Sequence, residues 1–325
     1  MFPPLFHAQA VNIIYFKGGT SLLYENFLDS IRLEVEKRLP PGCRVSLVRV
    51  QKNNGTPFDG LSFTEKGSRY SPTVYLDAFY QEYLRGMSLE HIARLLIQAY
   101  QGGQPVPTRQ LEQALDFEMA KTNIVFRLIN SNANRDRLGA LPHRDFLDLS
   151  LIYCLLVDDN EDRQMTSTVT LEQMTAWGIT EEELYQLSME NTPRLLPARI
   201  EKLSAVIERV TGVPVTHREN DYDLSVLTNQ KGLAGDGCIL YPGILKDFAD
   251  RTNNDVVILP SSIHEVLLLD LSEPVHFSEL NKMIQMINRA EVPREDRLSN
   301  HVYLYSRTSD RITIPAGTSA CDLTL

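Results

Sequence analysis

Two hydroxyls, an imidazole and a carboxylate lie together in one short segment of this chain. Two runs of four aliphatic residues, 256–259 and 266–269, flank an insert that contains Ser262, His264 and Glu265. Each run has the length of a strand, and the proline after the first run opposes further pairing, so the pattern predicts a buried hairpin with a polar tip. A hydroxyl, an imidazole that takes its proton and a carboxylate that orients the imidazole are the groups used in acyl transfer.

The same residues also have a structural interpretation, which we favour. On a regular strand Ser262 and His264 share one face and Glu265 points to the other, so a local triad requires an irregular loop. The sequence contains no Gly-x-Ser-x-Gly elbow. Hydroxyls and an imidazole commonly bind unpaired backbone groups in tight connections.

A second candidate site is formed by His143 and Arg144, which follow a proline and are close to Asp145 and Asp148. His143 could act as a general base, and the fork of Arg144 suits a carboxylate or a phosphate. The alternative is the start of a helix or strand at which Arg144 pairs with a carboxylate.

A third candidate is the pair of glycine-containing segments 228–232 and 235–238. Backbone N–H groups between a strand and a helix can bind an anion, with Asn229 and Gly235 as ligand residues. The Walker pattern is absent. Cys238 is either a second possible nucleophile or, as we favour, a buried inert thiol.

The spacing of histidines and cysteines does not predict a metal site. The seven histidines are dispersed and no His-x-x-x-His pair occurs, so we expect neither a metal nor a cofactor. No cysteine pair has Cys-x-x-Cys spacing and no signal peptide precedes them, so we expect free thiols in a reducing cytoplasm. The four cysteines are Cys43, Cys154, Cys238 and Cys321.

The net charge of −10 disfavours nucleic acid as a partner, because such binding depends on neutralised phosphates. The best local basic patch is interrupted by Asp136 and Asp145 and fits a solvated loop. It consists of Arg127, Arg135, Arg137 and Arg144. No run of about 18 apolar residues is present, so we expect no membrane span.

The order of predicted elements indicates an α+β protein with largely antiparallel sheets and two domains. An amphipathic helix is predicted over 20–38, followed by a strand and a turn at 53–55. The linker-like segment 102–107 places a boundary between domains 20–104 and 105–325. In the second domain we expect one long strand over 146–157 or a strand after a bend there, a helix over 198–210, and the hairpin described above.

Segments such as Ser71–Leu76, Leu141–Leu149, Leu259–Glu265 and Val302–Tyr305 recur in a protein family. On these segments the chain resembles a bacterial family named domain of unknown function 5688, common in gut Clostridia. The resemblance spans about residues 20 to 306, and residues 1–19 fall outside it as an N-terminal extension. It implies no activity, cofactor or partner. Among the matching segments, the block Pro260–Glu265 is specific.

Three functions remain open. The first is a soluble cytoplasmic accessory protein that binds another protein without catalysing a reaction. The second is a hydrolase-like enzyme with Ser262 or Cys238 as nucleophile and His264 or His143 as base. The third, binding of nucleic acid through Arg127–Arg144, is least favoured because of the charge.

Overall fold

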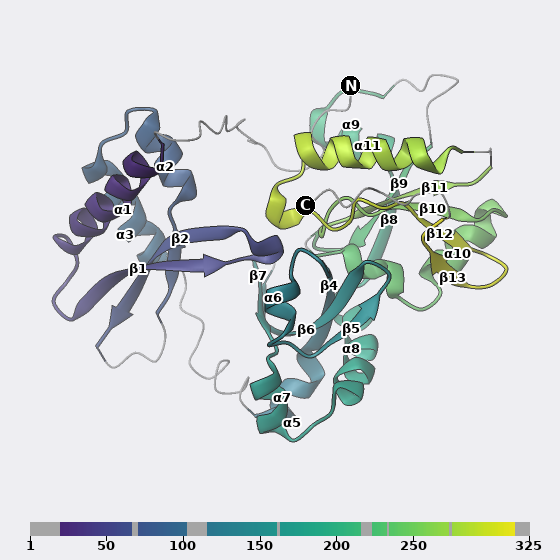
Figure 1. The fold of residues 1–325 in the computed structure, drawn as a ribbon, viewed down its shortest axis with the longest axis horizontal. Helices are drawn as coiled ribbons and strands as arrows, with labels where there is room; N and C mark the ends of the chain where they lie inside the picture. Colours follow the sequence, from purple (N-terminus) through teal and green to yellow (C-terminus); the bar gives the residue numbers. More distant parts are fainter. Residues whose placement is uncertain are drawn as a thin grey trace. The chain divides into compact units, whose positions relative to one another are not determined.

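The computed structural model shows an α+β protein, as predicted, and its described residues form antiparallel sheets packed with helices (Figure 1). They divide into two compact units, an N-terminal unit within 20–102 and a C-terminal unit from 116 onward. The expected extension 1–19, the linker residues 103–107 and Cys321 lie outside the described residues. The structure describes residues 20–66, 71–102, 116–160, 163–215, 223–232, 234–272 and 275–315.

The N-terminal unit packs helices on one face of a three-stranded sheet of order β1-β2-β3. The predicted amphipathic helix is present because Phe27, Ile31 and Val35 recur at helical spacing and are buried against the sheet. The elements are α1 (Thr20–Glu36), β1 (Cys43–Gln51), β2 (Pro57–Glu65), β3 (Thr73–Tyr75), α2 (Asp77–Leu84) and α3 (Leu89–Gly102).

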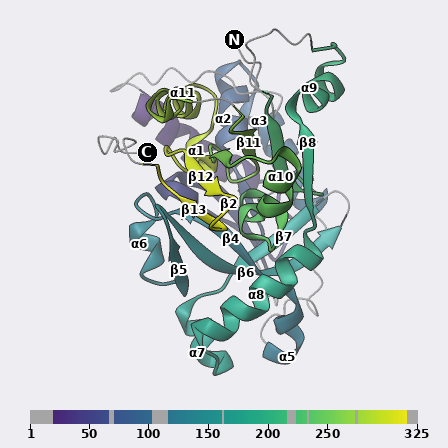
Figure 2. The same cartoon turned by 90° about the vertical axis from the view of Figure 1, so that its right-hand side faces the viewer.

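The C-terminal unit begins with a four-stranded antiparallel sheet in which β6 pairs with β4 on one side and with β5 and β7 on the other. The helix α8 lies against β4 and β6 (Figure 2). The elements are α5 (Phe117–Ala120), η2 (Lys121–Asn123), β4 (Ile124–Asn130), α6 (Arg135–Leu138), β5 (His143–Phe146), β6 (Leu149–Asn160), β7 (Arg163–Thr168), α7 (Leu171–Trp177) and α8 (Glu181–Leu195).

A six-stranded antiparallel sheet of order β13-β12-β10-β11-β9-β8 completes this unit. The predicted hairpin is present at its centre, where β10 pairs with β11 and every residue of β10 is buried. The elements are β8 (Ala198–Lys202), α9 (Leu203–Thr211), β9 (Ser225–Asn229), η3 (Asp236–Leu240), α10 (Ile244–Thr252), β10 (Val256–Leu259), β11 (Val266–Asp270), α11 (Phe277–Ala290), η4 (Arg294–Asp296), β12 (Tyr303–Ser306) and β13 (Arg311–Thr313).

The outer edge of β4 is covered by side chains in place of another strand. The backbone N–H of Phe126 donates to Thr192 Oγ1 at 3.0 Å, and that of Leu128 donates to Asp236 Oδ2 at 3.0 Å. Asn191 Nδ2 donates to the carbonyl of Ile124 at 3.1 Å. An uncovered edge would leave these backbone groups unpaired, so α8 and η3 close the sheet with side-chain oxygens and an amide.

One predicted element differs from the structure. The predicted helix 198–210 begins as the strand β8, because these residues pair with β9, and the helix α9 starts only at Leu203. Of the two alternatives for 146–157, the strand after a bend is present: a φ of 56° at Leu147 reverses the chain and separates β5 from β6. At both places pairing with a neighbouring strand decides the local structure.

Within the part of the chain that the structure describes, no helix is both long enough and apolar enough to cross a bilayer. The cysteines in that part, Cys43, Cys154 and Cys238, are free thiols, as expected.

The covered edge of β4 predicts a measurable loss of stability on Thr192→Val. The substitution keeps the shape of a side chain that is 2% exposed but leaves the N–H of Phe126 without an acceptor. We expect the free energy of unfolding to fall by about 1 to 3 kcal/mol, measured by urea unfolding of the full chain. Thr211→Val is the matched control, because the exposed Thr211 donates to the carbonyl of Ile207 as Thr192 donates to that of Ser188. This variant should change stability by less than about 0.5 kcal/mol. Equal losses in both variants would contradict this role of Thr192.

Candidate functional site

The polar tip, residues 260–265 between β10 and β11, is held by two other segments of the chain. The N–H of Gly235 and the hydroxyl of Thr228 donate to the carbonyl of His264 at 3.0 and 2.7 Å. The N–H of Ile263 donates to the carbonyl of Asp296 at 2.8 Å. The tip therefore lies between the residues that follow β9 and the residues around η4.

The backbone at Gly235 approaches its neighbours too closely for a side chain. A Cβ atom at this position would lie 2.3 Å from Thr228 Oγ1 and 2.6 Å from the carbonyl oxygen of His264. Gly235 therefore lets the segment after β9 approach the polar tip closely, and its N–H forms one of the hydrogen bonds between them. Asn229 is buried, and its Oδ1 accepts from the N–H of Lys231 at 2.9 Å within the same turn.

Both ring nitrogens of His264 face protein groups. The N–H of Ala234 donates to Nδ1 at 3.3 Å, which places the proton of the neutral ring on Nε2, 3.4 Å from Asp296 Oδ1. Burial is the largest influence and lowers the pKa of His264, but Asp296 outweighs it, so the pKa is raised. Ser262 Oγ accepts from the backbone N–H of His264 at 3.0 Å. These contacts favour the structural interpretation of the tip.

A buried carboxyl that the sequence did not single out lies next to the tip. Asp236 is fully buried, and burial raises its pKa to about 7, although Arg127 and the N–H of Leu128 act in the opposite direction. Burial also raises the pKa of Glu265, opposed by His264. The glycines around Asp236 marked the loop as unusual, but nothing in the sequence indicated that its carboxyl is buried.

Arg144 is held by two carboxylates, and Cys238 is buried. The guanidinium of Arg144 donates to Glu181 at 2.8 Å and Glu182 at 2.6 Å and lies 3.7 Å from the ring centroid of Tyr185. Hydrogen bonding to Glu181 raises the pKa of Arg144. Cys238 is fully buried, and burial raises the pKa of its thiol to about 12, so little thiolate is present at neutral pH.

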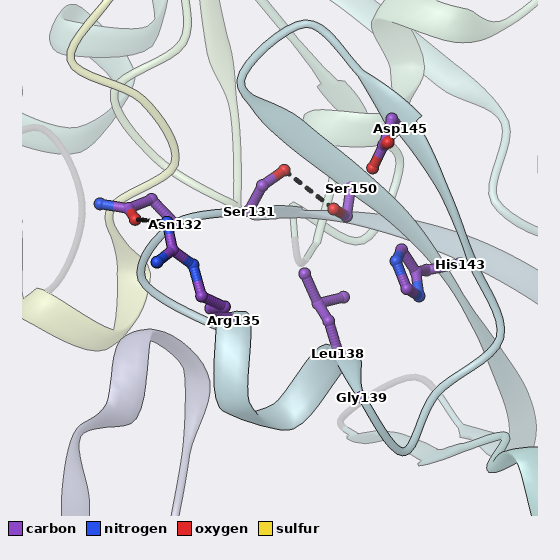
Figure 3. Close-up of a pocket in the computed structure, with 8 residues that line it drawn as sticks. All are labelled: Ser131, Asn132, Arg135, Leu138, Gly139, His143, Asp145 and Ser150. Carbon is purple, nitrogen blue, oxygen red and sulfur yellow. Dashed lines mark hydrogen bonds between the residues drawn. The ribbon is translucent and has the colours of Figure 1, made fainter.

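His143 lies on the opposite face of β5 from Arg144, because side chains alternate along a strand, and it lines a pocket of 410 Å³. We call this the serine pocket. Its wall includes Ser131 and Ser150, whose hydroxyl oxygens are 2.8 Å apart, and Asp145 (Figure 3). Arg135 and His143 lie on opposite sides of Leu138 in this view. The pocket thus brings together residues from the turn after β4, from α6, from β5 and from β6.

The hydrogen bond of His143 determines which ring nitrogen is basic. Nδ1 is 2.8 Å from the carbonyl oxygen of Leu141, and because a carbonyl only accepts, Nδ1 carries the proton of the neutral ring. Nε2 is then the nitrogen able to accept a proton. No described contact joins His143 to His264, so these two predicted bases belong to different parts of the unit. The sequence analysis identified His143 but missed Ser131 and Ser150.

Among the residues that the structure describes, no group of three or more His, Cys, Asp and Glu side chains could hold a metal ion.

Residues 24–307 match the model of a family of unknown function, DUF5688. The chain belongs to this family, which confirms the resemblance seen in the sequence. No curated protein and no solved structure matches the chain.

The raised pKa of Asp236 predicts a pH-dependent effect of Asp236→Asn. Below about pH 4 the carboxyl is protonated in both the folded and the unfolded chain, whereas between about pH 4 and 7 only the folded chain keeps the proton. Wild-type stability is therefore lost as pH rises to about 7, and a neutral amide avoids this loss. At pH 8 the variant should exceed the wild type by up to roughly 4 kcal/mol, and this gain should disappear near pH 4.

Denaturant unfolding of both proteins at pH 4, 6 and 8 measures this difference. Asp136→Asn, at an exposed aspartate of the same unit, is the control and should show no such trend. A variant whose stability relative to wild type is constant across these pH values would rule out the assigned role of Asp236.

Proposed function

We propose that the C-terminal unit is a hydrolase-like enzyme that takes a small ester into the serine pocket. The observation that carries this proposal is the pocket itself, which combines a pair of hydroxyls with an imidazole whose Nδ1 is fixed by a carbonyl. A concave site with a few convergent polar groups is the usual setting of a small-molecule reaction.

The two serines differ in access, and this difference assigns their roles. Ser150 is fully buried, whereas Ser131 is partly exposed, so Ser131 is the hydroxyl that a substrate can reach. Ser150 holds it through the 2.8 Å contact between their oxygens. Arg135 is the cation of the pocket lining, and its guanidinium donates to Asn132 Oδ1 at 3.0 Å. On substrate binding it would exchange this partner for the negative charge that develops on the substrate carbonyl oxygen.

The reaction uses two groups of this pocket, water and a general acid. Ser131 Oγ forms a bond to the substrate carbonyl carbon as its proton passes to His143 Nε2, the bond from that carbon to the alcohol oxygen breaks, and the general acid supplies the proton with which the alcohol leaves. Water then attacks the acyl-enzyme with His143 as base, and Ser131 is restored. The free thiols of Cys43, Cys154 and Cys238 support the cytoplasmic location that we propose with this activity.

A protein-binding role of the N-terminal unit is the second candidate. The helices of that unit cover one face of its sheet, and the other face carries Val50, 37% exposed, beside its cross-strand partner Phe58. The ring of Phe58 packs against Tyr75, and Lys52 lies 3.9 Å from the ring centroid of Tyr75. Exposed apolar and aromatic side chains on a sheet face favour contact with another protein.

A fluorophosphonate reagent tests the enzymatic proposal, because an activated serine displaces its fluoride. We expect peptide mapping by mass spectrometry to find the label on Ser131. Ser131→Ala should abolish labelling, and His143→Gln should slow it by about 100-fold because the general base is removed. Ser262→Ala is the matched control at the serine of the polar tip and should label at the wild-type rate. An unlabelled wild type, or a label that persists in Ser131→Ala, would refute the proposal.

A further inference from the structure

Asp148 collects three hydrogen bonds from a distant segment of the chain. It lies in the turn between β5 and β6, directly after Leu147. Its Oδ2 accepts from Ser299 Oγ at 2.7 Å and from His301 Nδ1 at 3.1 Å, and its Oδ1 accepts from the hydroxyl of Tyr303 at 2.5 Å. The carboxylate therefore joins the turn of the four-stranded sheet to the segment that leads into β12.

These hydrogen bonds keep Asp148 ionised. Burial is the largest single influence and acts to raise the pKa, but the bonds from His301, Tyr303 and Ser299 together hold the pKa of Asp148 below its ordinary value. An ionised carboxylate next to an imidazole favours the protonated ring and fixes its orientation. The side chain of His301 is 27% exposed, so the ring reaches the surface of the unit.

The two histidines near this turn therefore have different partners. His143 is held by the neutral carbonyl of Leu141, whereas His301 is held by the negative carboxylate of Asp148. A carboxylate stabilises an imidazolium far more than a carbonyl does. The first histidine thus suits the role of base, and the second suits the role of acid.

Backbone contacts connect Asp148 with the wall of the serine pocket. The N–H of Ser131 donates to the carbonyl of Asp148 at 3.1 Å, and Asn130 Nδ2 donates to the carbonyl of Leu298 at 3.1 Å. Ser131, which carries the proposed nucleophile, is therefore hydrogen-bonded through its backbone to Asp148, which holds His301. His301 itself is not part of the pocket lining, so a group that meets it must extend out of the pocket past Ser131.

We infer that protonated His301 is the general acid of the reaction proposed above, with Asp148 as the residue that positions it; the inference rests on that proposed function. As the bond between the substrate carbonyl carbon and the alcohol oxygen breaks, the proton of His301 passes to that oxygen, and the neutral alcohol leaves. His143 then releases to solvent the proton that it took from Ser131, and the ring of His301 takes one up, so both histidines are restored before water attacks the acyl-enzyme. The substrate class is then an ester with a poor leaving alcohol, whose acyl part occupies the pocket and whose alcohol part extends towards segment 299–303.

Leaving-group dependence tests this role in the full-length protein. Two esters with one acyl group are compared, a nitrophenyl ester, whose leaving anion needs no proton, and a phenyl ester, whose leaving group does. His301→Gln should lower phenyl ester turnover by about 100-fold and leave nitrophenyl ester turnover within about twofold. Asp148→Asn should likewise lower the ratio of phenyl ester turnover to nitrophenyl ester turnover. In the wild type, only phenyl ester turnover should fall as rising pH removes the proton from His301.

His276→Gln is the matched control, because it makes the same change at an exposed histidine of the same unit, at the start of α11. It should preserve the ratio between the two esters, and thermal unfolding verifies that each variant is folded. A wild type inactive on both esters refutes the proposed function itself. A wild type active on the nitrophenyl ester alone, or a His301→Gln variant that slows both esters equally or neither, overturns only the role of His301.

Discussion

The unpaired edge of β4 is the constraint on which the C-terminal unit depends. A strand that ends a sheet must satisfy its outward N–H and C=O groups, and here the acceptors for Phe126 and Leu128 are Thr192 and Asp236. The second of these brings a carboxyl into a fully buried position. The neighbouring Gly235 donates to the polar tip between β10 and β11. The need of β4 for hydrogen-bond acceptors therefore ties the four-stranded sheet to the six-stranded sheet.

Much of the fold could be predicted from the sequence where one local pattern dominates. The hairpin of β10 and β11 follows from two aliphatic runs, and α8 follows Thr180, whose side chain forms with Glu183 a capping box that is typical of a helix start. Prediction failed where a partner decides the structure. Residues 198–202 carry the spacing of the helix that follows them, and only their pairing with β9 makes them a strand.

The candidate site was predicted in part, because sequence adjacency and spatial adjacency differ. His143 and Arg144 are neighbours in the chain, yet strand alternation sends one to the serine pocket and the other to Glu181. Ser131 and Ser150 are 19 residues apart, and Asp148 and His301 are 153 apart. No spacing rule connects such pairs, since their contacts depend on sheet register and on how the two sheets pack.

The polar tip and the serine pocket differ in how their polar groups are used. At the tip, the ring nitrogens of His264 meet Ala234 and Asp296, and the hydroxyl of Ser262 accepts a backbone N–H. A group whose hydrogen bonds hold two loops together can change protonation only by disturbing those loops. In the pocket, a carbonyl fixes one nitrogen of His143 and leaves its basic nitrogen on a concave surface. Proton transfer to that nitrogen breaks no hydrogen bond between strands, and this difference favours the pocket over the tip as the place of the chemistry that we propose.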